Sequence, residues 1–258
     1  MTIFVSIISH GHEDILSSTS LLDEISKVAT VIIKNNRQLS QGKLTKLRLN
    51  KNIIIIDDGD YGLGFGHNNN YVFKYISDKI GIDKDDYFCV INPDIIVDGT
   101  TILDLVSIMQ RGNHQLCTIP LYLDENKTLR DESIRNFPVF IDFLKSFFLG
   151  KRNAVTLRAI SDGISSADWA AGSFLIFTAP LFLELKGFNQ RYFMYCEDID
   201  ICYRAKSNGI QLVCLTDYYA IHLAQRASRS FFSKNFVWHI KSIFIYLFLR
   251  NKKTISII

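Results

Sequence analysis

Four short runs of β-branched and aromatic residues recur through the N-terminal part of the chain, at residues 3–8, 31–33, 53–56 and 87–91. Apart from Ser6, each run is apolar, with no alternation of polar and apolar positions, which is the pattern of a strand buried on both faces. The segments between the runs are long enough to hold helices, so the runs predict parallel strands covered by helices. We therefore expect an α/β fold in the N-terminal half.

The bulk composition excludes several classes of protein. A chain of 258 residues that is 48% hydrophobic can bury a core as one domain or as two intimate lobes. The net charge of +3 is far from the basic surface that a nucleic-acid partner requires, so we expect no nucleic-acid binding. The five cysteines form no C-x-x-C pair and are expected to be reduced, buried thiols of a cytosolic protein. The run at residues 3–8 is too short for a signal peptide and has no basic segment before it.

Polar residues follow each of the four runs directly. Since ligands of open α/β sheets bind at the carboxyl ends of the strands, we expect these polar residues to meet at one edge. They are Ser9-His10-Gly11, Asn35-Asn36, Asp57-Asp58-Gly59 and Asn92-Pro93-Asp94.

A glycine-rich segment at residues 61–70 follows the third run and leads into a predicted helix. It resembles a dinucleotide-binding fingerprint but has His67 where the last glycine is needed, and it follows the third strand instead of the first. Gly64 and Gly66 would still let backbone amides approach a nucleotide or a phosphate. A plain tight turn is the alternative.

Asn92-Pro93-Asp94 places one carboxylate on a rigid turn at the end of the fourth run. A carboxylate in this position is able to hold a divalent cation against a diphosphate. The same tripeptide is also a common turn sequence, so the motif alone leaves both interpretations open.

A second acidic motif begins a predicted helix that ends near Asn208-Gly209. Glu197, Asp198 and Asp200 lie in its first turn, where negative charge also caps a helix favourably. Capping does not explain the aromatic approach at residues 191–195. Transfer of a sugar from a diphosphate needs a positive group on the leaving diphosphate and a base for the acceptor hydroxyl, and Asp94 and Asp198 are able to supply them. His222 is either a further metal ligand or a structural histidine.

Two segments are unusually apolar for the surface of a cytosolic protein. Residues 136–150 form either a core helix or a patch that touches lipid or a lipid-linked substrate. Residues 230–253 mix aromatic and aliphatic side chains with several lysines and arginines, but their longest uncharged run is far shorter than the roughly 20 residues that span a bilayer. They form either an interfacial anchor at an anionic membrane or a helix that packs on the domain or on a second subunit.

These motifs, in this order, resemble the inverting family-2 glycosyltransferases, and most closely the bacterial O-antigen rhamnosyltransferases that act on a lipid-linked N-acetylglucosamine. The resemblance covers nearly the whole chain. Its motifs lie at residues 9–14, 64–70, 92–94, 168–173, 192–200 and 229–232.

The resemblance implies a GT-A fold, a Rossmann-like and mostly parallel sheet flanked by helices, with a C-terminal amphipathic helical segment. It also implies a dTDP-L-rhamnose donor bound with Mg²⁺ or Mn²⁺, and transfer with inversion. Asp94 would be a metal ligand, with His222 as a second one, and Asp198 the general base with Glu197 beside it. The donor-binding residues would be Ser9, His10, Gly11, Asn35, Asn36, Gly64, Gly66, Asn68, Asn92 and Arg229, with Arg226 as second choice for the last, and the acceptor side would involve Trp169, Gly172 and Asp200.

One departure concerns the base of the donor, since relatives often carry Asp-Asn where this chain has Asn35-Asn36. An amide can still pair with a base edge, so this departure leaves the identity of the base open. We expect a catalytic domain at residues 1–229, divided near residue 98 into a nucleotide-sugar half and an acceptor half, and a membrane-associating segment at residues 230–258. The acceptor would be a polyprenyl-diphosphate-linked sugar at the cytoplasmic face of the inner membrane. Transfer of another sugar, a non-catalytic binding subunit and homo-oligomerisation remain open.

Overall fold

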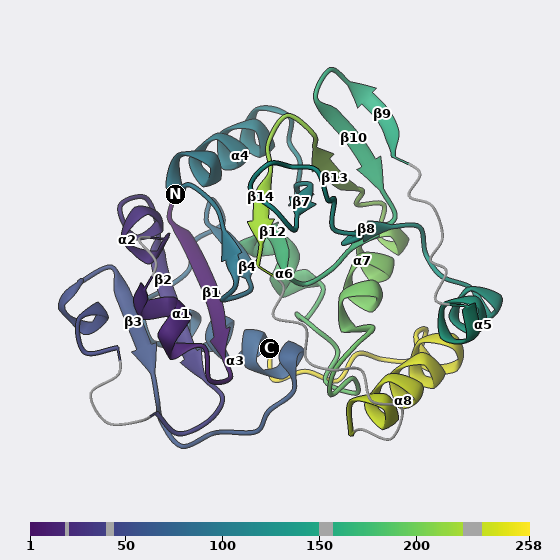
Figure 1. Ribbon diagram of the computed structural model, residues 1–258, viewed down its shortest axis with the longest axis horizontal. Helices are drawn as coiled ribbons and strands as arrows, with labels where there is room; N and C mark the ends of the chain where they lie inside the picture. Colours follow the sequence, from purple (N-terminus) through teal and green to yellow (C-terminus); the bar gives the residue numbers. More distant parts are fainter. Residues whose placement is uncertain (19–20, 40–43, 150–156, 224–233) are drawn as a thin grey trace.

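A computed structural model describes residues 1–258 except 19–20, 40–43, 150–156 and 224–233 (Figure 1). Its centre is a nine-stranded mixed sheet. In spatial order the strands are β3 (Ile53–Ile56), β2 (Thr30–Asn35), β1 (Ile3–Ser9), β4 (Tyr87–Ile91), β12 (Phe174–Thr178), β6 (Leu116–Thr118), β13 (Leu212–Leu215), β10 (Ile164–Ala167) and β9 (Arg158–Ser161).

Helices cover both faces of this sheet (Figure 1). They are α1 (Glu13–Ser18), α2 (Leu21–Ser26), α3 (Phe65–Lys79), α4 (Gly99–Arg111), α5 (Phe140–Leu149), α6 (Ala179–Glu184), α7 (Glu197–Ser207) and α8 (Lys234–Leu249), with a short 3-10 turn at Leu47–Leu49.

The parallel half of the sheet confirms the prediction from the four apolar runs. Strands β3, β2, β1 and β4 lie side by side in this order, and each adjacent pair is parallel. In the β1–β2 register, Ser9 is opposite Asn35. Their carboxyl ends therefore share one edge, as expected for a ligand site. Beyond β4 the sheet becomes mixed, because β12 pairs antiparallel with both β4 and β6. The α/β class is confirmed.

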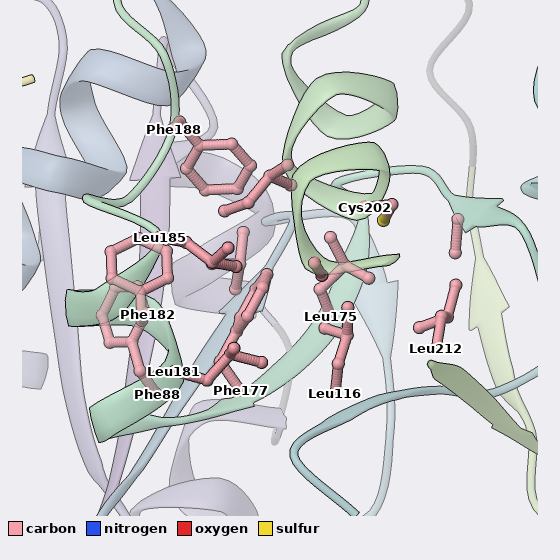
Figure 2. Close-up of a cluster of buried hydrophobic side chains, with 14 of the residues drawn as sticks. Phe88, Leu116, Leu175, Phe177, Leu181, Phe182, Leu185, Phe188, Cys202 and Leu212 are labelled. Atoms are coloured by element: carbon pink, nitrogen blue, oxygen red, sulfur yellow. The ribbon is translucent and has the colours of Figure 1, made fainter. Parts of the chain in front are cut away.

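Alternate residues of the central strands point to opposite faces of the sheet and belong to two separate hydrophobic cores. In β4, Phe88 and Val90 pack against α3, α6 and α7, whereas Cys89 and Ile91 face α2 and α4. The first core is rich in phenylalanine, with the rings of Phe88 and Phe182 only 4.7 Å apart (Figure 2). Burial of aromatic and aliphatic surface on both faces holds the sheet rigid at its centre. All five cysteines are buried in the structure, as their apolar surroundings predicted.

Two small sheets complete the edge at which the parallel strands end. One contains β5 (Ile95–Ile96), β14 (Ala220–His222) and β7 (Leu121–Tyr122), and the other pairs β11 (Trp169–Ala170) with β8 (Ile134–Arg135). The first brings residues from distant parts of the sequence beside Asn92-Pro93-Asp94. Within the described ranges, no helix has the length and apolar character needed to cross a bilayer.

Candidate active site

The turn after β4 places Asp94 beside His222. Strand β14 pairs antiparallel with β5, with His222 opposite Ile95, and Leu223 donates its backbone N–H to the Asp94 carbonyl at 2.9 Å. As a result the Asp94 carboxylate lies 3.5 Å from His222 Nε2. On its other side, His222 Nδ1 lies 2.6 Å from the carboxylate of Asp131. The two carboxylates therefore bracket one imidazole.

The protonation of this trio follows from its contacts. Burial by itself lowers the pKa of His222, but the hydrogen bonds and charges of Asp131 and Asp94 outweigh burial and raise that pKa to about 9. Burial alone raises the pKa of Asp94, but the hydrogen bond and charge of His222 outweigh it, so the net pKa of Asp94 is lowered. The trio is thus an ion-paired arrangement in which Asp94 stays ionised.

Asp94 and His222 suit a divalent cation chemically, since carboxylate oxygen and imidazole nitrogen are both ligands of Mn²⁺-type ions. A metal-bound histidine usually donates its other ring N–H to a carboxylate, which is the position of Asp131. Among the described residues, no group of three or more His, Cys, Asp or Glu side chains is arranged as a complete metal cage. Two protein ligands with the remaining positions filled by phosphate oxygens is a common arrangement for such ions.

The second acidic motif lies at the start of α7. Tyr195 and Cys196 both have positive φ, 71° and 64°, so two successive residues are held in the sparsely populated left-handed region immediately before Glu197. Conformations of this kind cost of order 1 kcal/mol or more each and persist only where packing enforces them. The sharp turn starts α7 with its carboxylates against the core, where Glu197 is buried.

The Asp198 carboxylate accepts hydrogen bonds from two backbone N–H groups. One is Gly172, at 3.2 Å, and the other is Ile199, at 2.8 Å. Burial raises the pKa of Asp198 more than these hydrogen bonds lower it. Burial and the neighbouring charge of Asp198 also raise the pKa of Glu197, to well above its usual range. The pair therefore favours a state in which Glu197 keeps its proton and Asp198 carries the charge.

Asp200 lies apart from this pair. Its side chain is fully buried and accepts hydrogen bonds from Arg204, at 2.7 Å, and from the Tyr192 hydroxyl, at 3.2 Å. Arg204 in turn binds the carbonyls of Leu185 and Gly187. The structure thus gives Asp200 a bracing position between α7 and the loop before it, with no surface left for the acceptor that the sequence assigned to it.

At the ends of β1 and β2, Asn35 differs from its neighbour Asn36. The side-chain amide of Asn36 is occupied, because it binds both the N–H and the carbonyl of Leu63. Asn35 is buried, and within the described part of the chain neither polar atom of its amide has a hydrogen-bond partner. Because unpaired buried amides are costly, Asn35 is suited to a hydrogen-bonding ligand at this edge.

The first strand's motif makes a tight corner. Ser9 is buried, and its hydroxyl accepts a hydrogen bond from the His12 N–H. His10 is exposed, and Gly11 has φ of 93° with the Arg37 guanidinium packed over its Cα, so a side chain there would collide with Arg37. The close approach at Gly11 brings a cation, which the sequence did not single out, next to the strand ends.

The glycine-rich segment has an internal contact that the sequence did not reveal. A Cβ at Gly64 would collide with the Phe193 carbonyl, and one at Gly66 would crowd Phe188. The Phe65 N–H donates to that same Phe193 carbonyl at 3.1 Å. The amide of Asn68 binds the carbonyls of Leu63 and Gly64. Because the two glycines have no side chain, the loop before α7 can pack against the first turn of α3. This packing connects the first turn of α3 to Glu197 and Asp198.

The remaining candidates surround these motifs. Asn92 donates its N–H to the Ser173 carbonyl, which ties the turn before Asp94 to the strand after Gly172. Trp169 is buried on β11 under the Arg135 guanidinium, whose charge also acts on Asp198. Arg226 and Arg229 lie outside the described residues.

Sequence reasoning missed Asp131, Arg37 and Arg135. Asp131 occupies a polar stretch with no motif, and only the pairing of β14 with β5 and β7 brings it to His222. The basic character of Arg37, directly after Asn35-Asn36, was the one available indication for that residue.

A mixed sheet with a carboxylate at the end of its fourth parallel strand, and a buried acidic pair at the start of a helix across the edge, is the arrangement of a GT-A glycosyltransferase. Solved structures support this fold. The chain matches GalNAc-T7 with UDP, GalNAc and Mn²⁺ at a TM-score of 0.61 and 12% identity, over 86% of this chain and 44% of that one. It matches residues 1–349 of S. aureus TarS at a TM-score of 0.56 and 13% identity, over 86% and 60% of the two chains. The chain thus spans less than two thirds of either protein.

Sequence comparison places the chain more closely. It is 37% identical to the rhamnosyltransferase WbbL of Escherichia coli K12 over 250 residues, which is 95% of this chain and 92% of the relative. It is 24% identical over 246 residues, 91% of this chain and 79% of the relative, to the N-acetylglucosaminyl-diphospho-decaprenol L-rhamnosyltransferase of Mycobacterium tuberculosis H37Rv. No protein-family profile matches the chain. The chain belongs to the rhamnosyltransferase family that includes WbbL.

Proposed function

We propose that the protein transfers L-rhamnose from dTDP-L-rhamnose to a polyprenyl-diphosphate-linked N-acetylglucosamine, with inversion, in the synthesis of a cell-surface polysaccharide such as O-antigen. The observation that carries this proposal is the separation of two charged centres across one edge of the sheet. Asp94 and His222 form one centre, and Glu197 and Asp198 form the other. The name of the mycobacterial relative supports the choice of acceptor.

In the proposed reaction, the acceptor hydroxyl attacks the anomeric carbon of rhamnose while the bond from that carbon to the diphosphate oxygen breaks. Asp198 takes the hydroxyl proton, and the electron pair of the broken bond leaves with dTDP. The Gly172 and Ile199 N–H groups hold the Asp198 carboxylate in one orientation for this transfer. Glu197, kept protonated by burial, leaves the negative charge on its neighbour.

Asp94 and His222 would hold Mg²⁺ or Mn²⁺, which when bound supplies positive charge to the leaving diphosphate. Asn35 would pair with the base of the nucleotide, because its buried amide has unsatisfied donors and an acceptor. Ser9, His10, Gly11, Asn36, Gly64, Gly66, Asn68 and Asn92 would shape the donor pocket around it, and Arg229 would contact the diphosphate. Trp169 and Gly172 would line the acceptor side.

We further propose that residues 1–229 are the catalytic domain, with a donor half up to residue 98, and that residues 230–258 attach it peripherally to the cytoplasmic face of the inner membrane. A lipid-linked acceptor has its sugar at a membrane surface, so the site must work there. The apolar and basic character of α8 supports this attachment.

Asp198→Asn tests the proposed function. The amide keeps the size of the side chain but cannot take a proton, so we expect transfer to fall by roughly 10²–10⁴-fold with dTDP still bound. Transfer of rhamnose to a short-chain lipid-diphosphate-GlcNAc is measured with and without a chelator, beside Asp104→Asn on the far helix α4 as control. Near wild-type turnover in Asp198→Asn would contradict the assignment of Asp198 as the base. Full activity in the presence of chelator would contradict the proposed requirement for a metal ion.

A further inference from the structure

The outer face of α8 carries an apolar stripe. Val237, Ile240, Phe244 and Phe248 follow at spacings of three, four and four residues, so they lie along one side of the helix. They are between 46% and 65% exposed, which is unusual for large apolar side chains that share a stripe. The rings of Phe244 and Phe248 lie 4.9 Å apart.

Helix α5 brings further exposed apolar residues to the same end of the molecule. It lies beside α8 at one end of the molecule (Figure 1), where the rings of Phe143 and Tyr246 are 6.1 Å apart. At its start, Val139, Phe140 and Ile141 are exposed by about half. We call these seven exposed residues, of which Val139 directly precedes α5, the α5–α8 face.

Basic residues predominate around α8, and α5 adds a single acidic residue, Asp142, in its first turn. The last acidic residue of the chain is Asp217, so the lysines and arginines after it have no acidic neighbours in sequence. Lys241, Lys252 and Lys253 are exposed on α8 and just beyond it. An anionic lipid surface complements an apolar stripe flanked by cations. A second copy would instead bring the same cations together across a two-fold axis.

The inner face of α8 packs on the loop before the catalytic pair. The Ser242 hydroxyl donates to the Met194 carbonyl at 2.7 Å, and Trp238 stacks on Phe193 with ring centroids 4.5 Å apart. The same loop contains Tyr195 and Cys196, whose left-handed backbone needs outside support. One helix therefore has the exposed stripe on one side and the strained catalytic loop on the other.

We propose that the α5–α8 face docks on an anionic lipid surface, and that docking fixes α8 so that residues 192–196 hold Glu197 and Asp198 in the catalytic geometry. The docking names the residues and the lipid charge for the membrane attachment proposed above, and the link to catalysis rests on the proposed rhamnosyl transfer. Because α8 has 16 residues and is about 24 Å long, it lies in the interface and does not span the roughly 30 Å hydrocarbon layer. The lipid surface thus acts on the active site through one packed helix.

Vesicle flotation tests the docking without any substrate. Vesicles of phosphatidylcholine mixed with phosphatidylglycerol should carry the full-length protein, and vesicles of phosphatidylcholine alone should carry it several-fold less well. The double variant Phe244→Ser/Phe248→Ser should weaken flotation by roughly tenfold or more. Leu103→Ser on α4, which removes an exposed leucine at a distance from α8 (Figure 1), should leave it unchanged. Equal flotation of all three proteins overturns the proposal, as does a concentration-dependent dimer that the double variant abolishes.

Amide hydrogen exchange tests the link between docking and the loop independently of rhamnosyl transfer. Anionic vesicles should slow exchange several-fold across residues 192–199, and Ser242→Ala should float normally but lose much of that protection. Exchange at residues 192–199 that is the same with and without vesicles would overturn the link. If the wild-type protein floats and is protected but transfers no rhamnose, the proposed function fails and the docking surface stands.

Discussion

His222 shows how a single side chain gains a defined role from its two neighbours. Its ring is held by Asp131 on Nδ1, so Nε2 faces Asp94. Orienting carboxylates of this kind fix the tautomer of a metal-binding histidine and make the ring a better ligand. The sequence left open whether His222 is a structural histidine or a metal ligand, and the contact that supports the proposed ligand role comes from a residue 91 positions away.

Asp131→Asn should weaken metal binding. The amide leaves the ring less firmly oriented and less basic, so we expect the affinity for Mn²⁺ to fall by about 10–100-fold, measured by titration with Mn²⁺ in the presence of saturating dTDP. Asp78→Asn, an exposed aspartate on α3 paired with Lys74, serves as the matched control. Unchanged Mn²⁺ affinity in Asp131→Asn would separate Asp131 from the metal site.

Glu197→Gln should change how stability depends on pH. Burial raises the folded-state pKa of Glu197 well above its unfolded value, so the folded protein binds a proton that the unfolded chain releases. Wild-type stability should therefore fall as pH rises from about 4.5, by at most about 1.4 kcal/mol per pH unit from this group, until Glu197 ionises in the folded protein. Glutamine has no proton to lose. The unfolding free energies of variant and wild type are measured by urea denaturation at several pH values. As pH rises, the variant should become more stable relative to the wild type. If the two free energies changed with pH in parallel, the burial argument would be contradicted.

At the scale of elements, the first turn of α3 and the loop before α7 form one unit. The three asparagines at residues 68–70 are fully buried, and they bind different parts of the structure. Asn69 accepts from Ser6 on β1, and Asn70 pairs with the backbone of Phe188. The glycines before them remove side-chain bulk where Phe193 and Phe188 approach. The glycine-rich loop and the start of α7, which we propose bind the donor and carry the base, are therefore positioned by the same contacts.

Gly64→Ala should disturb both motifs together. Its new Cβ would collide with the Phe193 carbonyl, a backbone atom that cannot rotate away. We expect a loss of about 1–3 kcal/mol in unfolding free energy from overpacking, together with a lower rate of transfer. Gly112→Ala is the control, because its Cβ meets only the ring of His114 at the end of α4. Equal melting temperatures for the two variants would show that the loop yields without cost.

The parts of this arrangement that follow local patterns were predictable. The runs of β1 to β4 are apolar except for Ser6, which predicts their burial, and parallel pairing then fixes the edge where Asp94 lies. The contacts of Asp131 with His222 and of Gly64 with Phe193 are between residues far apart in sequence, and no local periodicity encodes them. Asp200 shares the acidic motif of Asp198, but only the packing of Tyr192 and Arg204 shows that it is a brace.

At the scale of the whole molecule, the loop before α7 is held at both of its ends by α8 and by the segment after α8. Helix α8 packs on residues 193–195, while the segment after it returns to residues 189–191. The Gln190 N–H donates to the Ile255 carbonyl at 2.8 Å, and the Asn70 amide donates to Ser256. The C-terminal part of the chain is thus built into the structure that supports the active site.

Removal of residues 254–258 should therefore destabilise the protein. The truncation breaks the bond between Gln190 and Ile255, removes one hydrogen-bond partner each from the amides of Asn70 and Asn189, and uncovers Gly187, on which Ile258 packs. At about 1 kcal/mol per hydrogen bond, we expect a loss of roughly 2–3 kcal/mol, or a fall of about 4–12 °C in melting temperature for a chain of this size. Ile255→Ser keeps the backbone bonds and removes a side chain that is 52% exposed, so it should melt close to wild type. If the truncated protein had the same melting temperature as Ile255→Ser, residues 254–258 would contact the loop before α7 without stabilising it. A segment that stabilises the loop cannot be removed without lowering the free energy of unfolding.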